Sequence, residues 1–341
     1  MQPYTRGKLG IIACESGKPF AQKVVEELKK IIAKDKDSNG AYLINTKETR
    51  FSNTEIKTEI EESIRNKDIY IFQDVENKVN GLNVNDNFMV LKTVIQAARM
   101  SDAHYVTAVI PSFPYARQDK PKTREGITAA MAARELEDVG ATRVITLDVH
   151  NDAIGGFFRK AGLENLHASK NLMDYINKKI GLKDLVIVAP DAGAATRANH
   201  YAKKLGTKLA LIHKERDYSK ASTIENMHLL GEVNGKKVFV VDDMIDTAGT
   251  LVNAAEKLKK EGAKEIYFAA SLAMLNEPAV ERIAKAYKEG FITKIIGTDV
   301  IYHGEGFAKK HEWYEEISVA KYFARVIYNI NRGISISKLL K

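Results

Sequence analysis

Residues 238–250 read VFVVDDMIDTAGT, an apolar run that changes abruptly into carboxylates, small residues and hydroxyls. The segment that follows, TLVNAAEKLKKEG (250–262), has apolar residues at helical spacing. A continuously apolar strand that leads directly into a helix is typical of a parallel sheet covered by helices on both faces. Ligands of such sheets bind beyond the carboxyl ends of the strands, so residues 242–250 are expected to form a binding loop.

The chemistry of this loop suits a ligand that carries a phosphate group. Its second half consists of Asp246, Thr247, Ala248, Gly249 and Thr250. Backbone N–H groups and hydroxyls at the start of a helix form a cradle for phosphate. Asp242 and Asp243 add acceptors for sugar hydroxyls or for a cation. The simpler alternative is an ordinary helix cap, made by Asp246 or Thr247, beside an acidic turn in solvent.

The same alternation of strand and helix runs through the whole chain. Apolar strand candidates lie at residues 9–14, 69–73, 105–111, 143–149, 185–190, 208–213, 236–242, 265–271 and 294–300. The paired glycines of GGFFRKAGLENLHAS (155–169) mark the expected joint. We therefore predict an α/β fold of two domains, residues 1–160 and 161–314, each a parallel-rich sheet flanked by helices. A C-terminal helix within 315–341 is expected to join the first domain.

Composition excludes several classes of protein. Hydrophobic residues make up 45% and charged residues 28% of the 341 positions, and no apolar run is long enough to span a membrane. The lone Cys14 rules out an intramolecular disulfide and predicts a cytoplasmic protein. The formal charge of +8 comes from lysines scattered along helices, which favours a solvated surface and small anionic substrates over nucleic acid.

Longer motifs resemble known families. VVDDMIDTAGT resembles the phosphoribosyl-diphosphate loop of the type I phosphoribosyltransferase superfamily. FPYARQDK (113–120), RVITLDVHNDAIGGFF (143–158) and LALIHKERD (209–217) together resemble ribose-phosphate diphosphokinases, and so does RFSNTEIKTEIEESIR (50–65). The resemblance covers nearly the whole chain in the right order. It implies two similar phosphoribosyltransferase-like domains and an ATP-dependent enzyme of nucleotide biosynthesis.

The resemblance implies a reaction and roles for the loop. The β,γ-diphosphoryl group of ATP passes to the anomeric hydroxyl of ribose 5-phosphate, giving phosphoribosyl diphosphate and AMP. Residues 246–250 would hold the 5-phosphate, and Asp242 and Asp243 would contact the ribose hydroxyls. Lys214 and Arg216, which begin a polar flap over residues 216–226, would be the catalytic residues that stabilise negative charge on the transferring group.

The resemblance also assigns the ATP and metal sites. His150 and Asp191 are associated in the family with Mg²⁺ on the ATP phosphates, although His150 is equally suited to a direct hydrogen bond to phosphate. Arg117 and Gln118 are expected to contact the adenine nucleotide.

A third segment is expected to complete the ATP site from a neighbouring subunit. Phe51 would pack on the adenine ring, and Glu55 would accept a hydrogen bond from the amino group of adenine. Asn53 belongs to the same segment, and the alternative for Phe51 is an ordinary core aromatic. The implied assembly is a homo-oligomer of dimers, with a hexamer expected.

The chain departs from the family pattern at several positions. Asn53 and Thr54 replace the usual Asp-Gly, and SLAMLNEPA (271–279) lacks the usual His. Asp152 and Gly155 lie where Ser and Gln are common in a regulatory phosphate site, so we expect regulation by phosphate and ADP to be weakened or absent.

Two other functions stay open from the sequence. One is a non-catalytic regulatory paralogue, which the retention of Lys214, Arg216 and the whole loop disfavours. The other is a nucleobase phosphoribosyltransferase, which leaves FPYARQDK and the first domain unexplained.

Overall fold

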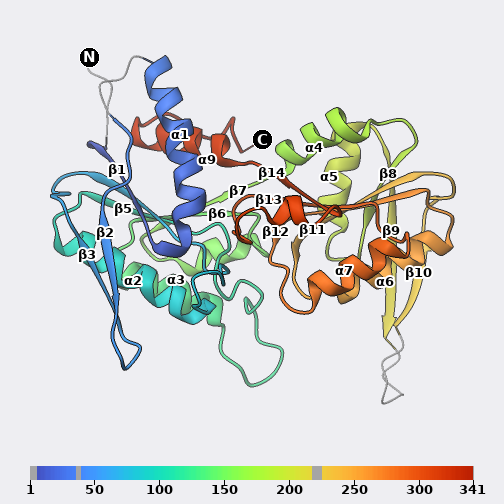
Figure 1. The fold of residues 1–341 in the computed structure, drawn as a ribbon, viewed down its shortest axis with the longest axis horizontal. Coiled ribbons are helices and arrows are strands. Elements are labelled where there is room, and N and C mark those ends of the chain that lie inside the picture. The colour runs from blue at the N-terminus through green and yellow to red at the C-terminus, as the bar shows by residue number, and fades with distance from the viewer. Residues whose placement is uncertain (1–5, 36–39, 217–224, 341) are drawn as a thin grey trace. The chain divides into compact units, whose positions relative to one another are not determined.

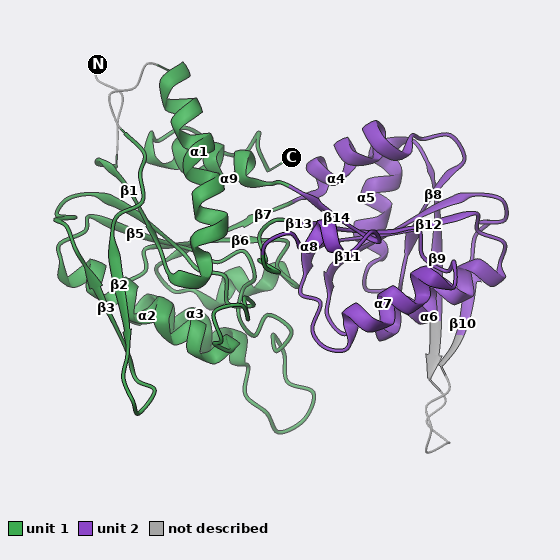
Figure 2. Ribbon diagram, in the orientation of Figure 1, with its two compact units in different colours: residues 1–167, 299–304, 318–341 green, residues 168–298, 305–317 purple. Residues whose placement is uncertain are grey.

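The computed structural model describes residues 6–35, 40–216 and 225–340, except the side chains of 214–216 and 225–226. The chain forms two compact units (Figure 2). The first consists of Met1–His167, Asp299–Gly304 and Ser318–Lys341, and the second of Ala168–Thr298 and Glu305–Ile317.

A five-stranded parallel sheet forms the centre of the first unit, in the order β1-β4-β5-β6-β7 (Figure 1). Its strands are β1 (Leu9–Ala13), β4 (Asp68–Phe72), β5 (Tyr105–Val109), β6 (Arg143–Leu147) and β7 (Gly162–Leu166). Its helices are η1 (Glu15–Gly17), α1 (Lys18–Lys34), α2 (Val84–Met100), α3 (Thr128–Asp138), η2 (Asp152–Phe157) and α9 (Ala320–Asn331). Strands β1 and β4 are buried along their whole length, as expected for a sheet covered on both faces. The C-terminal helix α9 packs against α1.

A seven-stranded sheet forms the centre of the second unit, in the order β10-β9-β8-β11-β12-β13-β14. Its strands are β8 (Leu185–Ala189), β9 (Lys208–Arg216), β10 (Glu225–Leu230), β11 (Lys237–Ile245), β12 (Glu265–Ala273), β13 (Lys294–Thr298) and β14 (Tyr314–Ile317). Its helices are α4 (Ser169–Tyr175), η3 (Ile176–Ile180), α5 (Ala195–Leu205), α6 (Gly249–Lys260), α7 (Ala279–Lys288) and α8 (Phe307–Lys310). The pairing is parallel except between β9 and β10.

Strands β2 (Thr46–Arg50) and β3 (Ile56–Ile60) form a separate antiparallel hairpin. It packs on α2 and projects past that helix in Figure 1. This hairpin was not predicted from the sequence, because its strands are largely polar and only half-buried.

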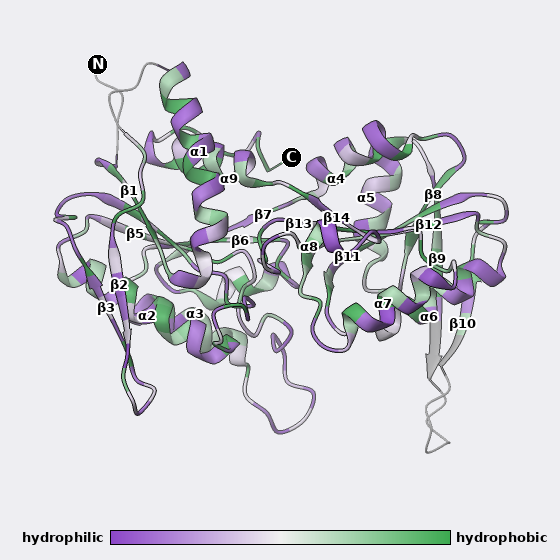
Figure 3. Cartoon of the chain, in the orientation of Figure 1, coloured by the Kyte–Doolittle hydropathy of each residue, from purple (hydrophilic) through white to green (hydrophobic). Residues whose placement is uncertain are grey.

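The predicted fold class is confirmed: both units are parallel-rich sheets flanked by helices. Figure 3 shows helices with one hydrophobic and one hydrophilic side, the pattern of helices that cover a sheet. Several strands differ from the expectation. Strand β11 does not end at Asp242 but continues to Ile245, because β12 pairs with it as far as Ala273. Strand β7 lies beyond the predicted joint at residue 160, yet it pairs with β6 and belongs to the first unit.

Within the described ranges, no helix is both long enough and apolar enough to cross a lipid bilayer.

Candidate active site

The predicted binding loop leaves the sheet of the second unit at the end of β11. This strand lies between β8 and β12, and all three run in the same direction. Helix α6 begins at Gly249, and its N-cap residue is Ala248, with the left-handed backbone angle φ of 58°. The N-cap residue, an alanine, makes no side-chain cap, and Asp246 Oδ1 accepts a hydrogen bond from Asn276.

Adjacent carboxylates in β11 share one arginine. Asp243 is buried, with 6% of its surface exposed, whereas Asp242 is half-buried. Nη1 of Arg197, in the first turn of α5, lies 3.4 Å from Asp242 Oδ1 and 3.6 Å from Asp243 Oδ1. Burial, and after it the neighbouring Asp243 carboxylate, raises the pKa of Asp242, while Arg197 acts in the opposite direction.

Backbone groups orient the same carboxylates. The N–H of Asp243 donates to Asp242 Oδ1 at 2.9 Å, and the N–H of Met244 donates to Asp243 Oδ1 at 3.0 Å. Each carboxylate is thus held by the strand that carries it, which restricts its rotamers before any ligand arrives.

Neighbouring strands bring other predicted residues to the same edge of the sheet. Asp191 follows β8, and its Oδ1 accepts a hydrogen bond of 3.0 Å from the N–H of Ala194. Strand β9 pairs with β8 and ends with the segment that contains Lys214 and Arg216. The side chains of Lys214 and Arg216 lie outside the described residues, so their catalytic role stays a prediction.

Loops of the first unit carry another group of predicted residues. Arg117 and Gln118 are exposed on the loop after β5, and His150 is exposed on the loop after β6. A hydrogen bond of 2.6 Å from Asn151 Nδ2 to Asp119 Oδ2 ties these two loops together. The structure therefore brings these candidates for ATP binding to one edge of the five-stranded sheet.

Phe51, Asn53 and Glu55 lie elsewhere in the first unit, at the tip of the β2–β3 hairpin. Phe51 N donates to the Glu55 carbonyl at 2.8 Å, and Glu55 N donates to Asn53 Oδ1 at 3.2 Å. The Phe51 side chain is not a core aromatic, because 48% of its surface is exposed. The hairpin has its own sheet and presents these side chains outward.

Sequence reasoning missed three residues that contact the binding loop or its acids: Arg197, Asn276 and Arg282. Arg197 was recognisable in principle, because it lies just after PDAG in a helix that follows a strand next to β11. The contacts of Asn276 and Arg282 depend on the path of the chain after β12, which no local pattern reveals.

The residues present are compatible with a magnesium site. Within the described part of the chain no cluster of three or more metal-ligating side chains occurs, and His150 and Asp191 belong to different units. Mg²⁺ bound to nucleotide phosphates does not need such a cluster, because one or two carboxylates with water and phosphate oxygens suffice. The carboxylates at the edge of the second sheet satisfy this requirement.

A parallel sheet with an acid-bearing strand that leads through a short loop into a helix is typical of a phosphoribosyltransferase-type α/β protein. Comparisons with known proteins agree with this class. Residues 9–140 match the N-terminal domain of ribose phosphate pyrophosphokinase, and residues 161–308 match the phosphoribosyl transferase domain.

Relatives cover nearly the whole chain. A ribose-phosphate pyrophosphokinase of Caldanaerobacter subterraneus is 39% identical over 99% of both chains. Ribose-phosphate pyrophosphokinase A of Dictyostelium discoideum is 41% identical over 85% of this chain and 88% of its own. The crystal structure of phosphoribosylpyrophosphate synthetase from Mycobacterium smegmatis superposes with a TM-score of 0.82 at 30% identity, covering 95% of this chain and 98% of that one. This chain belongs to the ribose-phosphate pyrophosphokinase family, also called the ribose-phosphate diphosphokinases.

Proposed function

We propose that this protein is a ribose-phosphate diphosphokinase, a transferase that moves the diphosphoryl group of ATP to the anomeric hydroxyl of ribose 5-phosphate. The products are phosphoribosyl diphosphate, a precursor for nucleotide biosynthesis, and AMP. The observation that carries this proposal is the loop after β11, with Asp242 and Asp243 before it and the N-terminus of α6 behind it, in a chain of this family.

The loop supplies what the acceptor requires. The N-cap residue of α6 is Ala248, whose side chain cannot cap the helix, so the N–H groups at the start of α6 suit the dianionic 5-phosphate. Asp242 and Asp243 would accept hydrogen bonds from ribose hydroxyls, and this contact orients the sugar for attack.

ATP would use residues from the first unit. Arg117, Gln118 and His150 lie on loops that a hydrogen bond connects, which supports their joint role in binding the nucleotide. Phe51, Asn53 and Glu55 would hold adenine. Because the hairpin tip presents them outward, the proposal assigns them to the ATP site of a neighbouring subunit.

The transfer itself requires neutralisation of a crowded polyanion. Lys214 and Arg216, in the segment that ends β9, are proposed to stabilise charge on the transferring group. Mg²⁺, held by His150 and Asp191 together with the ATP phosphates, would supply further neutralisation of the triphosphate. The attacking hydroxyl must approach the β-phosphorus in line, so orientation of both substrates is the main task of the protein.

We further propose a cytoplasmic homo-oligomer built from dimers into a hexamer. The exposed hairpin tip supports an assembly in which one subunit completes the site of another. The single cysteine, Cys14, is buried, so the chain does not depend on a disulfide. Native mass spectrometry of the purified protein tests the subunit number directly, and a monomer that is fully active would contradict the assembly.

One assay distinguishes this function from its alternatives. AMP release from ATP is measured with and without ribose 5-phosphate and Mg²⁺, and we expect release only when all three are present. A folded protein that releases no AMP under any of these conditions would favour the regulatory paralogue. Consumption of phosphoribosyl diphosphate driven by a free nucleobase would favour the nucleobase phosphoribosyltransferase.

A further inference from the structure

The segment after β12 folds back onto the binding loop. Strands β11 and β12 pair as far as Ile245 and Ala273, and the chain then turns at Leu275, whose φ is 49°. The N–H of Leu275 donates to the carbonyl of Ile245 at 3.0 Å. Residues 274–282 therefore begin beside the point where the loop leaves the sheet.

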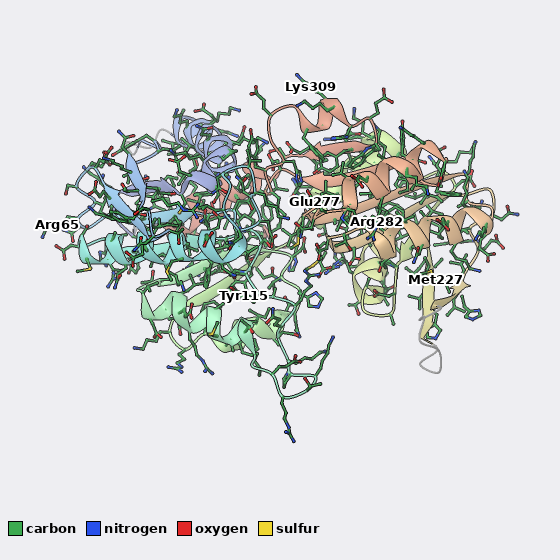
Figure 4. All side chains as sticks on the ribbon, turned by 60° about the horizontal axis from the view of Figure 1, so that its bottom comes forward. Arg65, Tyr115, Met227, Glu277, Arg282 and Lys309 are labelled. Atoms are coloured by element: carbon green, nitrogen blue, oxygen red, sulfur yellow. The ribbon has the colours of Figure 1, made fainter. Side chains whose placement is uncertain are left out.

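Side chains of this segment bind the loop at consecutive positions. Asn276 Nδ2 donates to Asp246 Oδ1 at 2.6 Å. Arg282 Nη1, from the exposed side of α7, donates to the carbonyl of Thr247 at 3.0 Å. Figure 4 labels Arg282 together with Glu277 of the same segment.

The backbone conformation of the loop is unfavourable at Ala248. Ala248 has a left-handed conformation, which is unfavourable for a residue with a side chain. The peptide before it is the one whose carbonyl Arg282 holds. A hydrogen bond to that carbonyl fixes the orientation of the Thr247–Ala248 peptide, whose N–H points away from its own carbonyl.

Gly249 shows how closely Arg282 approaches the loop. A Cβ atom at Gly249 would lie 3.3 Å from Arg282 Nη1. The guanidinium thus fills the space beside the first residue of α6. It also adds positive charge at a helix N-terminus, where the macrodipole is already positive and an anion is favoured.

We propose that Asn276 and Arg282 are positioning residues for the ribose 5-phosphate loop. Asn276 orients the Asp246 carboxylate, and Arg282 fixes the Thr247–Ala248 peptide so that the amides of residues 248–250 converge on the 5-phosphate. Neither residue takes part in the diphosphoryl transfer. The identity of the ligand in this inference rests on the proposed function. The hydrogen bonds that hold the loop in place belong to the protein itself and do not depend on a ligand.

A KM-against-kcat comparison tests these roles. Arg282→Met keeps the length of the side chain but removes the donors, and Asn276→Ala removes the other contact. We expect each to raise the KM for ribose 5-phosphate roughly tenfold, the effect of losing a hydrogen bond to a charged or constrained group. The KM for ATP should change less than twofold. Arg282→Lys keeps a charged donor and is expected to recover part of the loss.

The matched control is Lys285→Met, one turn along α7. Lys285 is exposed and pairs only loosely with Glu289, at 3.9 Å. The Lys285→Met substitution removes the same type of charge from the same helix, at a side chain whose ion pair is with Glu289 and not with the loop. Because the control makes the same chemical change, a general effect of charge would appear in both variants.

Amide hydrogen exchange of Val252 and Leu275, whose N–H groups donate to the carbonyls of Ala248 and Ile245, gives a readout that does not need activity. We expect faster exchange there in Arg282→Met and in Asn276→Ala, and unchanged exchange in Lys285→Met. If wild-type protein releases no AMP, the proposed function fails. The exchange measurement still tests whether Asn276 and Arg282 hold the loop in place. Unchanged exchange in both variants would overturn the inference, and so would an equal rise in both KM values.

Discussion

Arg197 Nη1 lies within 3.6 Å of carboxylate oxygens of both Asp242 and Asp243, which are adjacent in β11. This arginine places a positive charge against the acids proposed to contact the ribose hydroxyls. Carboxylates this close disfavour each other's ionisation, and the guanidinium offsets that repulsion. Burial and Asp243 still raise the pKa of Asp242, so the guanidinium offsets that effect only in part.

Replacing Arg197 should therefore weaken binding of the sugar. Arg197→Gln removes the charge and is expected to raise the KM for ribose 5-phosphate roughly tenfold, because a half-buried carboxylate pair loses its counter-ion. Arg197→Lys should raise this KM less, because it keeps the positive charge. Lys204→Gln, an exposed position on the same helix, is the control. Steady-state kinetics with each substrate varied in turn measure the effect, and a KM that stays within twofold of the wild type would refute the assigned role.

Gly249→Ala should weaken the same loop by a steric route. The added Cβ would meet Arg282 Nη1 at 3.3 Å, so the guanidinium must shift by a few tenths of an ångström, which disturbs its hydrogen bond to the Thr247 carbonyl. We expect a several-fold increase in the KM for ribose 5-phosphate with little change in melting temperature. Gly40→Ala, where a Cβ would meet no atom within 4 Å, is the control. Equal kinetics for both alanine variants would count against the close approach of Arg282.

The pH dependence of stability is predicted from Asp74 in the first unit. Burial raises the pKa of Asp74 to about 8, although its oxygens accept hydrogen bonds from the backbone N–H groups of Tyr302 and Glu76. A carboxyl group whose pKa is raised in the folded state contributes stability at low pH, and that contribution is lost as pH rises through the folded pKa. The free energy of unfolding should therefore decrease between about pH 4 and pH 8, the unfolded and folded pKa values of this carboxyl group.

Asp74→Asn should flatten this pH dependence, because its amide cannot ionise. The variant loses one acceptor and is expected to be less stable than the wild type at pH 6, with a smaller difference at pH 9. Asp174→Asn, at an exposed position, should follow the wild-type curve. Urea unfolding at a series of pH values provides the measurement. A slope for Asp74→Asn as steep as that of the wild type would show that another group is responsible.

Regulation by phosphate should be weak. Asp152 is exposed and its Oδ1 accepts a hydrogen bond of 2.7 Å from Asn165 Nδ2, so a carboxylate is held where the family resemblance implies a polar anion-binding residue. A carboxylate repels phosphate. Titrations with phosphate and with ADP should show little activation and no non-competitive inhibition, whereas Asp152→Ser should increase the response to phosphate. Strong phosphate activation of the wild type would contradict this prediction.

Local patterns were sufficient for much of the fold and for the residues of the loop. Strands such as β4 and β8 are apolar at nearly every position, and such a run identifies a buried strand without any knowledge of its partners. The hairpin β2–β3 was missed because half-buried polar strands carry a weak signal. Strand β7 was missed within a segment whose paired glycines suggested only a joint.

The C-terminal helix was expected to join the first domain, but its sequence did not indicate which element it would meet. A hydrophobic face on a helix indicates that it packs, but not against which element. The tertiary structure resolves this, because α9 packs on α1 and Asn331 Nδ2 donates to Asp68 Oδ2 at 3.0 Å.

The binding loop shows most clearly how far the sequence alone identifies a site and where the tertiary structure is needed. The sequence identified Asp242, Asp243 and residues 246–250, because acids, small residues and hydroxyls between a strand and a helix have a chemical meaning of their own. It did not identify Arg197, Asn276 or Arg282, which lie 45, 30 and 35 residues from their partners in the chain. Those contacts exist only because parallel pairing places β8, β11 and β12 side by side, so that the segments following these strands meet at one edge.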